Sequence, residues 1–355
     1  MATTTSTFPP HGKIALLNCD ATAPEFIASY GNITNLFTSL YTKFLIELTG
    51  GESSIGLKSV QDPLGLPEVM KSFRVDPFDA VNRHLPADVE VYDSVIVSGS
   101  GLNINGGDLW IEELGKFLHD TAVHHQKVKL IGVCFGHQLI ARAVFGLEVK
   151  LNPHGYQIGP FDVALNETGR VLFPGRADLT IPMFHQKAVF TQERLAAFAK
   201  MCEEEPYQVP RGRHGQLGEY RIWGHTEKVE NQGMVSVSGD IGGDDKLDVD
   251  DIHIFTCQGH PELTSGMMSL LLNLNEEHID PEVVADARRR IAAFRGTLDW
   301  FVLSRLMWAL STRHSYVLSG ASCEPSKVSR GLGERSGESV FVLVADTNST
   351  HRVPV

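Results

Sequence analysis

The chain has 355 residues, of which 42% are hydrophobic and 21% are charged, and 31 Lys and Arg against 43 Asp and Glu give a formal net charge of −12. This length allows one large domain or two small ones. The negative charge argues against nucleic-acid binding, which needs a basic face. The longest apolar stretches, such as Trp300 to Leu310, are shorter than the ~20 residues that span a bilayer. Since the N-terminus also lacks the pattern of a signal peptide, we expect a cytoplasmic protein that acts on small molecules and has no nucleic-acid or membrane partner.

The five cysteines are widely scattered and form no C-x-x-C pair. A disulfide framework or a zinc-thiolate site is therefore not expected. Four of them are expected to be inert: Cys19, Cys202, Cys257 and Cys323.

Strands and helices alternate through the first half of the chain. Short continuous apolar runs, such as Val128–Val133 (VKLIGV), are typical of buried parallel strands. Apolar residues at helical spacing, as at Phe37, Leu40, Phe44 and Leu48, indicate amphipathic helices. In chain order we expect a strand at Lys13–Cys19, a helix at Phe26–Leu48, the start of a strand at Phe73–Val75, a strand at Ser94–Ser98, a helix at Trp110–His125, the strand at Val128–Val133 and a helix at Gln138–Phe145.

From residue 149 to 260 the pattern changes to short strand-like pieces, which we expect to form the far half of the sheet and an antiparallel ribbon. Surface loops are expected at Cys202–Glu219 and Gly239–Asp251. The second loop resembles a calcium loop in composition only and lacks its ligand spacing, so no metal is predicted. The expected strands are Gly159–Leu165, Ala188–Phe190, Arg221–Trp223, Met234–Val237 and His253–Cys257.

The alternation predicts an α/β fold with an open, mostly parallel sheet, helices on both faces and a small antiparallel ribbon. Residues 1–12 are expected to be a disordered lead, and 13–275 the main domain. A helical pattern at Pro281–Leu310 predicts a C-terminal helical extension over 276–310. The tail 311–355 is rich in Ser, Gly and Arg, and only its apolar run Ser339–Ala345 could form a strand.

A candidate nucleophile stands between a predicted strand and a predicted helix, in the sequence Gly132-Val133-Cys134-Phe135-Gly136. This is the pattern of a nucleophile elbow with cysteine in place of serine. The strained turn requires small neighbours two residues on either side, and glycine fills both positions. The helix N-terminus would favour a thiolate at Cys134, and the N–H of Phe135 would point into an oxyanion hole.

Candidate partners follow two other predicted strands. His260 can act as a general base toward the Cys134 thiol, and Glu262, two residues on, can orient the imidazole because residues i and i+2 of an extended segment point the same way. The Gly-rich turn Ser98–Gly101 can supply a second oxyanion donor at the N–H of Ser100. Strand ends of an open α/β sheet meet at one crevice, so these groups are expected to converge.

Together, Gly-Val-Cys-Phe-Gly-His-Gln (132–138), Gln-Gly-His-Pro-Glu (258–262) and Ser-Gly-Ser-Gly (98–101) resemble the class I glutamine amidotransferase family in motif, order and separation. Within it the chain looks most like stand-alone fungal and plant members, including plant γ-glutamyl peptidases. The resemblance covers about residues 13–275. It implies a flavodoxin-like fold and no cofactor.

The resemblance also implies a mechanism, in which Cys134 attacks a γ-amide or γ-glutamyl peptide bond and a γ-glutamyl thioester is then hydrolysed. It implies that His260 is the base and Glu262 its orienter, and that Gln138 lines the glutamine site. The N–H groups of Ser100 and Phe135 would supply the oxyanion hole. The sequence departs from the family at His185-Gln186-Lys187, where relatives often carry His-x-Asp or a similar acidic pattern, so substrate contacts there are expected to differ.

Three functions remain open. The first is hydrolysis of glutamine to supply ammonia to a partner synthetase, since no P-loop or other nucleotide motif is visible in the chain. The second is a stand-alone γ-glutamyl peptidase that acts on glutathione conjugates or small γ-glutamyl metabolites. Either enzyme could serve a specialised biosynthetic pathway. The third is a non-catalytic binding subunit, against which the intact Cys, His and Glu argue.

Overall fold

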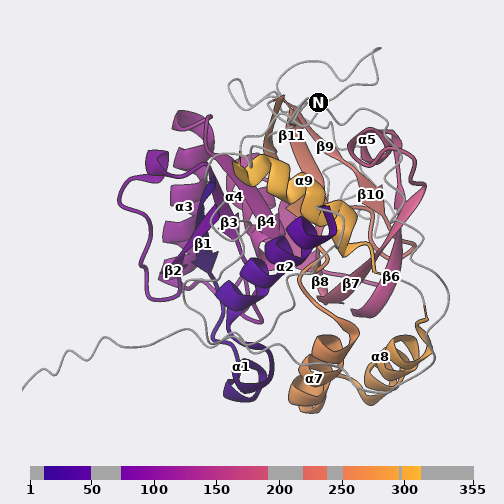
Figure 1. The fold of residues 1–355 in the computed structure, drawn as a ribbon. Helices are drawn as coiled ribbons and strands as arrows, with labels where there is room; N and C mark the ends of the chain where they lie inside the picture. The colour runs from indigo at the N-terminus through magenta and orange to yellow at the C-terminus, as the bar shows by residue number, and fades with distance from the viewer. Residues whose placement is uncertain (1–11, 49–72, 191–218, 238–250, 296–297, 313–355) are drawn as a thin grey trace, which may run out of the picture.

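A computed structural model describes residues 12–48, 73–190, 219–237, 251–295 and 298–312. At its centre is a seven-stranded sheet with the order β2-β1-β3-β4-β12-β11-β9 (Figure 1). Its strands are β1 (Gly12–Asn18), β2 (Phe73–Asp79), β3 (Ser94–Val97), β4 (Lys129–Val133), β9 (Glu219–Ile222), β11 (Met234–Val237) and β12 (Ile252–Cys257).

The first five strands of that order are parallel, and β11 and β9 continue the sheet in antiparallel pairing. The parallel part has the 2-1-3-4-5 order of a flavodoxin-like sheet. Two smaller antiparallel sheets accompany it, so the predicted fold class is confirmed. One joins β10 (Gly224–His225), β6 (Gln157–Leu165) and β7 (Asp178–His185), and the other joins β5 (Glu148–Leu151) and β8 (Lys187–Phe190).

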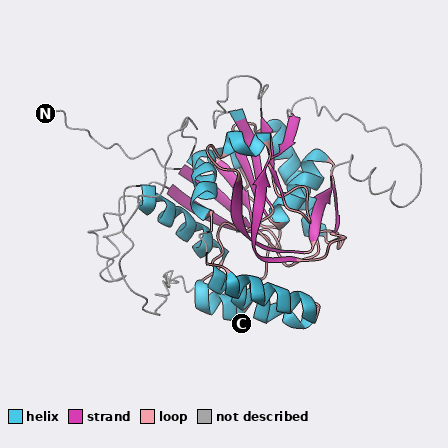
Figure 2. Cartoon of the chain, turned by 90° about the vertical axis from the view of Figure 1, so that its right-hand side faces the viewer, coloured by secondary structure: helices cyan, strands magenta, loops and turns pink. Residues whose placement is uncertain are grey.

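Alternate residues of the central strands point to opposite faces of the sheet, and each face is covered by helices (Figure 2). Ile14 and Leu16 of β1 pack in one apolar cluster with α2 (Ile33–Leu48) and α9 (Trp300–Thr312), which lie side by side (Figure 1). Ala15 and Leu17 pack in a second cluster with α3 (Leu109–His124) and α4 (Phe135–Phe145). The continuous apolar runs of these strands are therefore explained by burial on both faces.

Three further helices lie together at one end of the molecule (Figure 1). They are α1 (Pro24–Tyr30), α7 (Ser265–Asn275) and α8 (Pro281–Ala293). Helices α7 and α8 pack on β6 through a small apolar cluster that includes Ile158 and Leu272. The short helix α5 (Glu167–Leu172) and the 3-10 turns Val89–Val91 and Glu276–His278 complete the described helices.

The prediction of a single helix over Phe26–Leu48 is wrong, because the structure has two helices there, α1 and α2. Gly31 adopts a φ of 83° and its N–H closes α1 on the carbonyl of Ile27. Asn32 and Asn35 then exchange side-chain to backbone hydrogen bonds of 2.9 and 3.0 Å, which start a new helix in the manner of a capping box.

The predicted helix at Pro281–Leu310 is also two helices. Phe294 takes extended dihedral angles and ends α8. At the start of α9, Asp299 accepts a 2.8 Å hydrogen bond from the N–H of Thr180, donates its own N–H to the carbonyl of Thr180 and pairs with Arg176. These contacts tie α9 to β7, and its apolar face belongs to the core of the main sheet.

Several sequence predictions lie outside the described residues. These are the lead before Gly12, most of the segments 202–219 and 239–251, the predicted strand Ser339–Ala345 and the tail after Thr312. Within the described ranges, no helix has the length and apolar character needed to cross a membrane.

Trp308 offers a test of whether α9 is integral to the domain. It is 1% exposed and its ring contacts those of Tyr41, Phe73 and Phe44 at centroid distances of 5.4, 5.3 and 6.4 Å. We expect Trp308→Ala to lower the free energy of unfolding by about 3–5 kcal/mol, because it leaves a large cavity between α9 and the sheet. Urea unfolding followed by circular dichroism measures this change.

The control is Leu274→Ala, since Leu274 is 36% exposed and should lose less than about 1 kcal/mol. An equally small loss for Trp308→Ala would mean that α9 is a loosely attached appendage.

Candidate functional site

The candidate site lies where three neighbouring parallel strands end. Val97 of β3 is paired with Gly132 of β4, and Val133 of β4 is paired with Cys257 of β12. The segments that follow these strands therefore leave the sheet at the same edge. They are the Gly-rich turn Ser98–Gly101, the elbow at Cys134 and the segment 258–262.

Cys134 has a left-handed backbone, with φ of 51° and ψ of −100°, at the N-terminus of α4. A non-glycine residue in this region is strained, and the surrounding hydrogen bonds hold it there. The N–H of Cys134 donates to the carbonyl of Cys257 at 2.8 Å, and the N–H of Gly136 donates to that of Ser98 at 3.2 Å. The elbow predicted from the sequence is therefore formed, with the sulfur at the start of a helix.

The two glycines of the elbow are required by close backbone approach. A Cβ on Gly136 would lie 2.2 Å from the carbonyl oxygen of Val97, and a Cβ on Gly132 would lie 2.7 Å from the carbonyl carbon of Gly136. Backbone atoms cannot move aside as a flexible side chain can. Helix α4 can therefore sit against β3 and β4 only because both positions lack a side chain.

His260 and Glu262 form the pair that the sequence predicted. The Nδ1 of His260 donates to Oε1 of Glu262 at 2.7 Å, and the Glu262 side chain is 2% exposed. The backbone N–H of His260 donates to the carbonyl of Pro182 at 2.8 Å, which fixes the segment on β7. With Nδ1 engaged by the carboxylate, the other ring nitrogen is the one available to the sulfur of Cys134.

The charge of His260 is set by its two neighbours. Burial alone would lower the pKa of the imidazole, but the charges of Cys134 and Glu262 and hydrogen bonds to both raise the pKa well above its usual value. The imidazole therefore holds its proton at neutral pH, as an imidazolium between a carboxylate and the sulfur. An imidazolium in this position is poised to give a proton to a leaving group.

Two backbone donors in the segments that follow β3 and β4 have no internal partners within the described residues. In the described part of the chain, neither the N–H of Ser100 nor that of Phe135 makes a hydrogen bond. The turn that carries Ser100 is held by Asp20, whose carboxylate accepts from the N–H of Gly101 at 3.0 Å. The ring of Phe135 stacks on Trp110 at 5.6 Å, so both donors are attached to well-packed segments. The sequence alone did not single out Asp20, although it directly follows the first strand.

Gln138 is buried, and its amide nitrogen already has two internal acceptors. Nε2 donates to the backbone carbonyl of Lys187 at 3.1 Å and to Oε1 of Gln258 at 3.0 Å. These bonds fix the orientation of the amide and leave its oxygen as the atom able to accept a bond from a substrate. The role of Gln138 in substrate binding, implied by the family resemblance, stays a prediction.

Two further buried histidines lie near the site and were not assigned a catalytic role from the sequence. Nδ1 of His185 donates to the carbonyl of Lys187 at 2.9 Å, and Nδ1 of His137 contacts Oγ1 of Thr256 at 2.8 Å. Burial lowers the pKa of His185 to about 4 and that of His137 to about 3. Both rings are therefore neutral at pH 7, in contrast to His260, and they act as packing and hydrogen-bonding groups.

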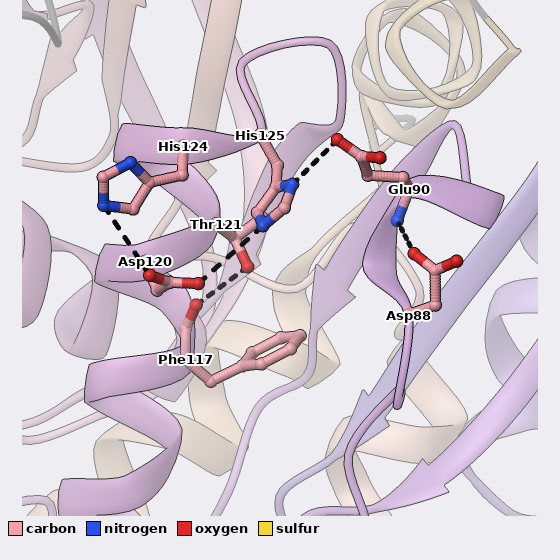
Figure 3. Close-up of polar contacts among 7 residues, drawn as sticks. All are labelled: Asp88, Glu90, Phe117, Asp120, Thr121, His124 and His125. Carbon is pink, nitrogen blue, oxygen red and sulfur yellow. Dashed lines mark hydrogen bonds and ion pairs between the residues drawn. The ribbon is translucent and has the colours of Figure 1, made fainter.

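His124 and His125 lie at the C-terminal end of α3, outside this site (Figure 3). Both approach Asp120 at 3.8 Å, and His125 also contacts Glu90 at 3.1 Å. The side chains of His124 and Asp120 are 65% and 64% exposed, so these are solvated surface contacts. No group of three or more His, Cys, Asp or Glu residues able to hold a metal occurs among the described residues.

Comparisons with known proteins find relatives that are named glutamine amidotransferases or γ-glutamyl peptidases. No family model matches the chain. A glutamine amidotransferase-like protein of Schizosaccharomyces pombe is 29% identical over 56% of this chain and 74% of its own length. A Saccharomyces cerevisiae protein that carries the name glutamine amidotransferase is 28% identical over 50% of this chain and 55% of its own. γ-Glutamyl peptidase 3 of Arabidopsis thaliana is 24% identical over 66% of this chain and 78% of its own.

Among solved structures, a glutamine amidotransferase from Thermotoga maritima covers 85% of this chain and 98% of its own at a TM-score of 0.49 and 14% identity. The sequence relatives confirm the predicted resemblance to glutamine amidotransferases and γ-glutamyl peptidases. The chain is thus similar to glutamine amidotransferase-like proteins and to γ-glutamyl peptidases. Within that group, its relatives include both amidotransferase-like proteins and peptidases.

The imidazolium at His260 can be tested through the reactivity of Cys134. We expect iodoacetamide to alkylate Cys134 in the native protein at pH 7, and the rate to fall at least about tenfold in His260→Ala, because the imidazole that assists the sulfur as a base is gone. Peptide mass spectrometry measures the rate at each cysteine.

Cys19 and Cys257 are internal controls, because burial raises the pKa of both thiols and both are 0% exposed. They should stay unlabelled until the protein unfolds. An unchanged labelling rate of Cys134 in the His260→Ala protein would contradict the pairing.

The buried neutral histidines predict a dependence of stability on pH. An unfolded histidine has a pKa near 6.5, whereas His185 and His137 have lowered values of about 4 and about 3. Between pH 6.5 and 4 the unfolded chain therefore binds protons that the native chain does not, so the free energy of unfolding falls as the pH falls.

We expect His137→Asn to reduce this slope by up to about 1.4 kcal/mol per pH unit, which is the limit for one group. Urea unfolding at several pH values between 4 and 7 measures the slope. If the wild type and the variant have equal slopes, His137 is not the neutral buried group described above.

Proposed function

We propose that this protein is a cysteine hydrolase in which Cys134 is the nucleophile, His260 the acid and base, and Glu262 the group that orients His260. The observation that carries the proposal is the hydrogen-bonded His260–Glu262 pair beside a strained cysteine at the N-terminus of α4. A nucleophile, a base and an orienting carboxylate in this order are the parts that acyl transfer requires.

In the first half of the proposed reaction, the Cys134 sulfur forms a bond to the γ-carbonyl carbon of the substrate. The carbonyl oxygen becomes an oxyanion, which the N–H groups of Ser100 and Phe135 stabilise. His260 then gives its proton to the nitrogen of the leaving group as the carbon–nitrogen bond breaks. Ammonia or an amine departs, and the γ-glutamyl group remains on Cys134 as a thioester.

In the second half, a water molecule attacks the thioester carbon while His260 accepts one of its protons. The carbon–sulfur bond breaks, the sulfur recovers its pairing with the imidazolium, and glutamate leaves. Glu262 stabilises the imidazolium in both halves without leaving its hydrogen bond. No cofactor is needed in this sequence of steps.

Glutamine is the first proposed substrate, and the ammonia that its hydrolysis yields would go to a partner synthetase. Two of the relatives carry amidotransferase names, which supports this assignment. An amidotransferase needs an activated acceptor, so the proposal includes a second protein that supplies one.

The second candidate is a stand-alone γ-glutamyl peptidase. It is favoured by the similarity to γ-glutamyl peptidase 3, which extends over a larger share of this chain than the other two matches. Such an enzyme would cleave the γ-glutamyl bond of glutathione conjugates with the same groups and would need no partner.

The decisive test incubates the purified full chain with L-glutamine and, separately, with a glutathione S-conjugate, and follows products by mass spectrometry. We expect Cys134→Ala to lower turnover of the preferred substrate by at least about 10³-fold while leaving the fold intact, because no other group can form the thioester. Cys19→Ala is the matched control, since Cys19 is fully buried and has no role in the proposed reaction.

Release of glutamate and ammonia from glutamine would support the amidotransferase role, and loss of the γ-glutamyl group from the conjugate alone would support the peptidase role. Absence of turnover and of any acyl adduct on Cys134 would favour a non-catalytic binding subunit and contradict the proposal.

A further inference from the structure

Lys187 is the first residue of β8, and its side chain reaches a loop next to the Gly-rich turn of the candidate site. It lies on β8 opposite Leu151 of β5, with Val149 and Val189 on the same face of this two-stranded sheet. Val149 and Val189 are buried in the cluster that includes α4, so this face of the sheet is turned toward the nucleophile helix. The Lys187 ammonium then hydrogen-bonds to Oδ1 of Asn103, in the loop after the Gly-rich turn.

The backbone of Lys187 is attached to the first turn of the nucleophile helix. Its carbonyl accepts hydrogen bonds from Nε2 of Gln138 and from Nδ1 of His185. Gln138 is itself tied to the nucleophile, because its N–H donates to the carbonyl of Cys134 at 3.0 Å. Lys187 therefore links the first turn of α4 to the loop that follows the Gly-rich turn Ser98–Gly101.

That loop is held in place independently of Lys187. Arg142 of α4 donates to the carbonyl of Ile104 at 2.7 Å, and the amide of Asn105 donates to the carbonyl of Val149 at 2.8 Å. The Asn103 side chain also accepts from the N–H of Asn105 at 3.1 Å. The lysine is thus not required to fasten the loop, and its ammonium is available for another partner.

The charge of Lys187 lacks a counter-ion in the described part of the chain, where its ammonium has the neutral Asn103 as its polar partner. Partial burial lowers the pKa of this lysine, which reflects the cost of removing a cation from water. His185 adds no second positive charge beside Lys187, because its ring is neutral. A half-buried cation without an anion, carried by a residue that is bonded to the first turn of the helix of Cys134, is the arrangement expected of a site for a substrate anion.

We propose that Lys187 recognises the α-carboxylate of the γ-glutamyl group and makes the site selective for acyl groups that carry this anion. This inference rests on the proposed γ-glutamyl hydrolase function. Glutamine and every γ-glutamyl conjugate carry this carboxylate, whose carbon is four carbon–carbon bonds from the carbon that Cys134 attacks. On binding, the ammonium exchanges the amide oxygen of Asn103 for a carboxylate, which forms a stronger, charge-assisted hydrogen bond.

The test compares L-glutamine with 4-aminobutanamide, which has the same amide and amine but lacks the carboxylate. The variant is Lys187→Met, which keeps the length and apolar stem of the side chain and removes its charge. We expect KM for glutamine to rise by about 10- to 100-fold, the range of a hydrogen bond to a charged group, with kcat changed less than about threefold. The kinetic constants for 4-aminobutanamide should not change, so the preference for glutamine should collapse.

Two variants act as controls. Lys187→Arg keeps the charge and should retain most of the preference. Lys150→Met removes an exposed lysine from the opposite face of the same small sheet, where it pairs with Glu148, and should leave both substrates unaffected. Thermal unfolding of each variant shows whether the fold is kept. If Lys187→Met is less stable, the preference of Lys187→Arg for L-glutamine over 4-aminobutanamide still tests the role of the charge.

The possible failures are distinguishable. An active wild type in which Lys187→Met lowers kcat/KM for both substrates equally would overturn the role of Lys187 and leave the proposed function standing. If a glutathione S-conjugate is the better substrate, the same comparison is made with its analogue that lacks the γ-glutamyl carboxylate. A wild type inactive on every γ-glutamyl compound would contradict the proposed function and, with it, this assignment.

Discussion

The parallel pairing of β3, β4 and β12 in one register is the constraint on which the site depends. It brings three strand ends to the same edge, and the hydrogen bond from Cys134 to the carbonyl of Cys257 joins the nucleophile to the strand that leads to His260. The elbow is strained, and its strain is tolerated because α4 is packed against two strands with no side chain between them. Helix α9 contributes at a distance, because it covers one face of that sheet.

The electrostatics of the site follow from unequal burial and pairing of chemically similar groups. Within the described residues, four histidines lie in or near the interior, His137, His185, His253 and His260, and of these only His260 pairs with a carboxylate, which opposes the effect of burial on its pKa. Cys257 is fully buried, with its thiol pKa raised, whereas Cys134 faces an imidazolium. The contrast shows why one cysteine is suited to nucleophilic attack and its neighbour on the adjacent strand is suited to packing.

The segment His185–Lys187 gives this site its individual character. It presents a neutral, buried imidazole and a cation, and the carbonyl of Lys187 accepts hydrogen bonds from His185 and from Gln138 in the first turn of α4. In the proposed function, Cys134, His260 and Glu262 carry out acyl transfer, and Lys187 of β8 is proposed to select the acyl group. The same scaffold can thus serve different substrates through changes at one strand.

The sequence by itself determined the fold class, the identity of the elbow and the pairing of His260 with Glu262, because these depend on local signals: apolar runs, glycines at fixed offsets, and residues two apart in an extended segment. It did not determine the break after Tyr30, which rests on reciprocal bonds between Asn32 and Asn35, or the docking of α9 in the main core. Only the tertiary structure decided that Gln138 is held by Gln258 and that Lys187 reaches Asn103, since these contacts join residues from 84 to 120 positions apart. Such long-range juxtapositions leave no periodic trace in the chain, because they are set by how the strands and helices pack.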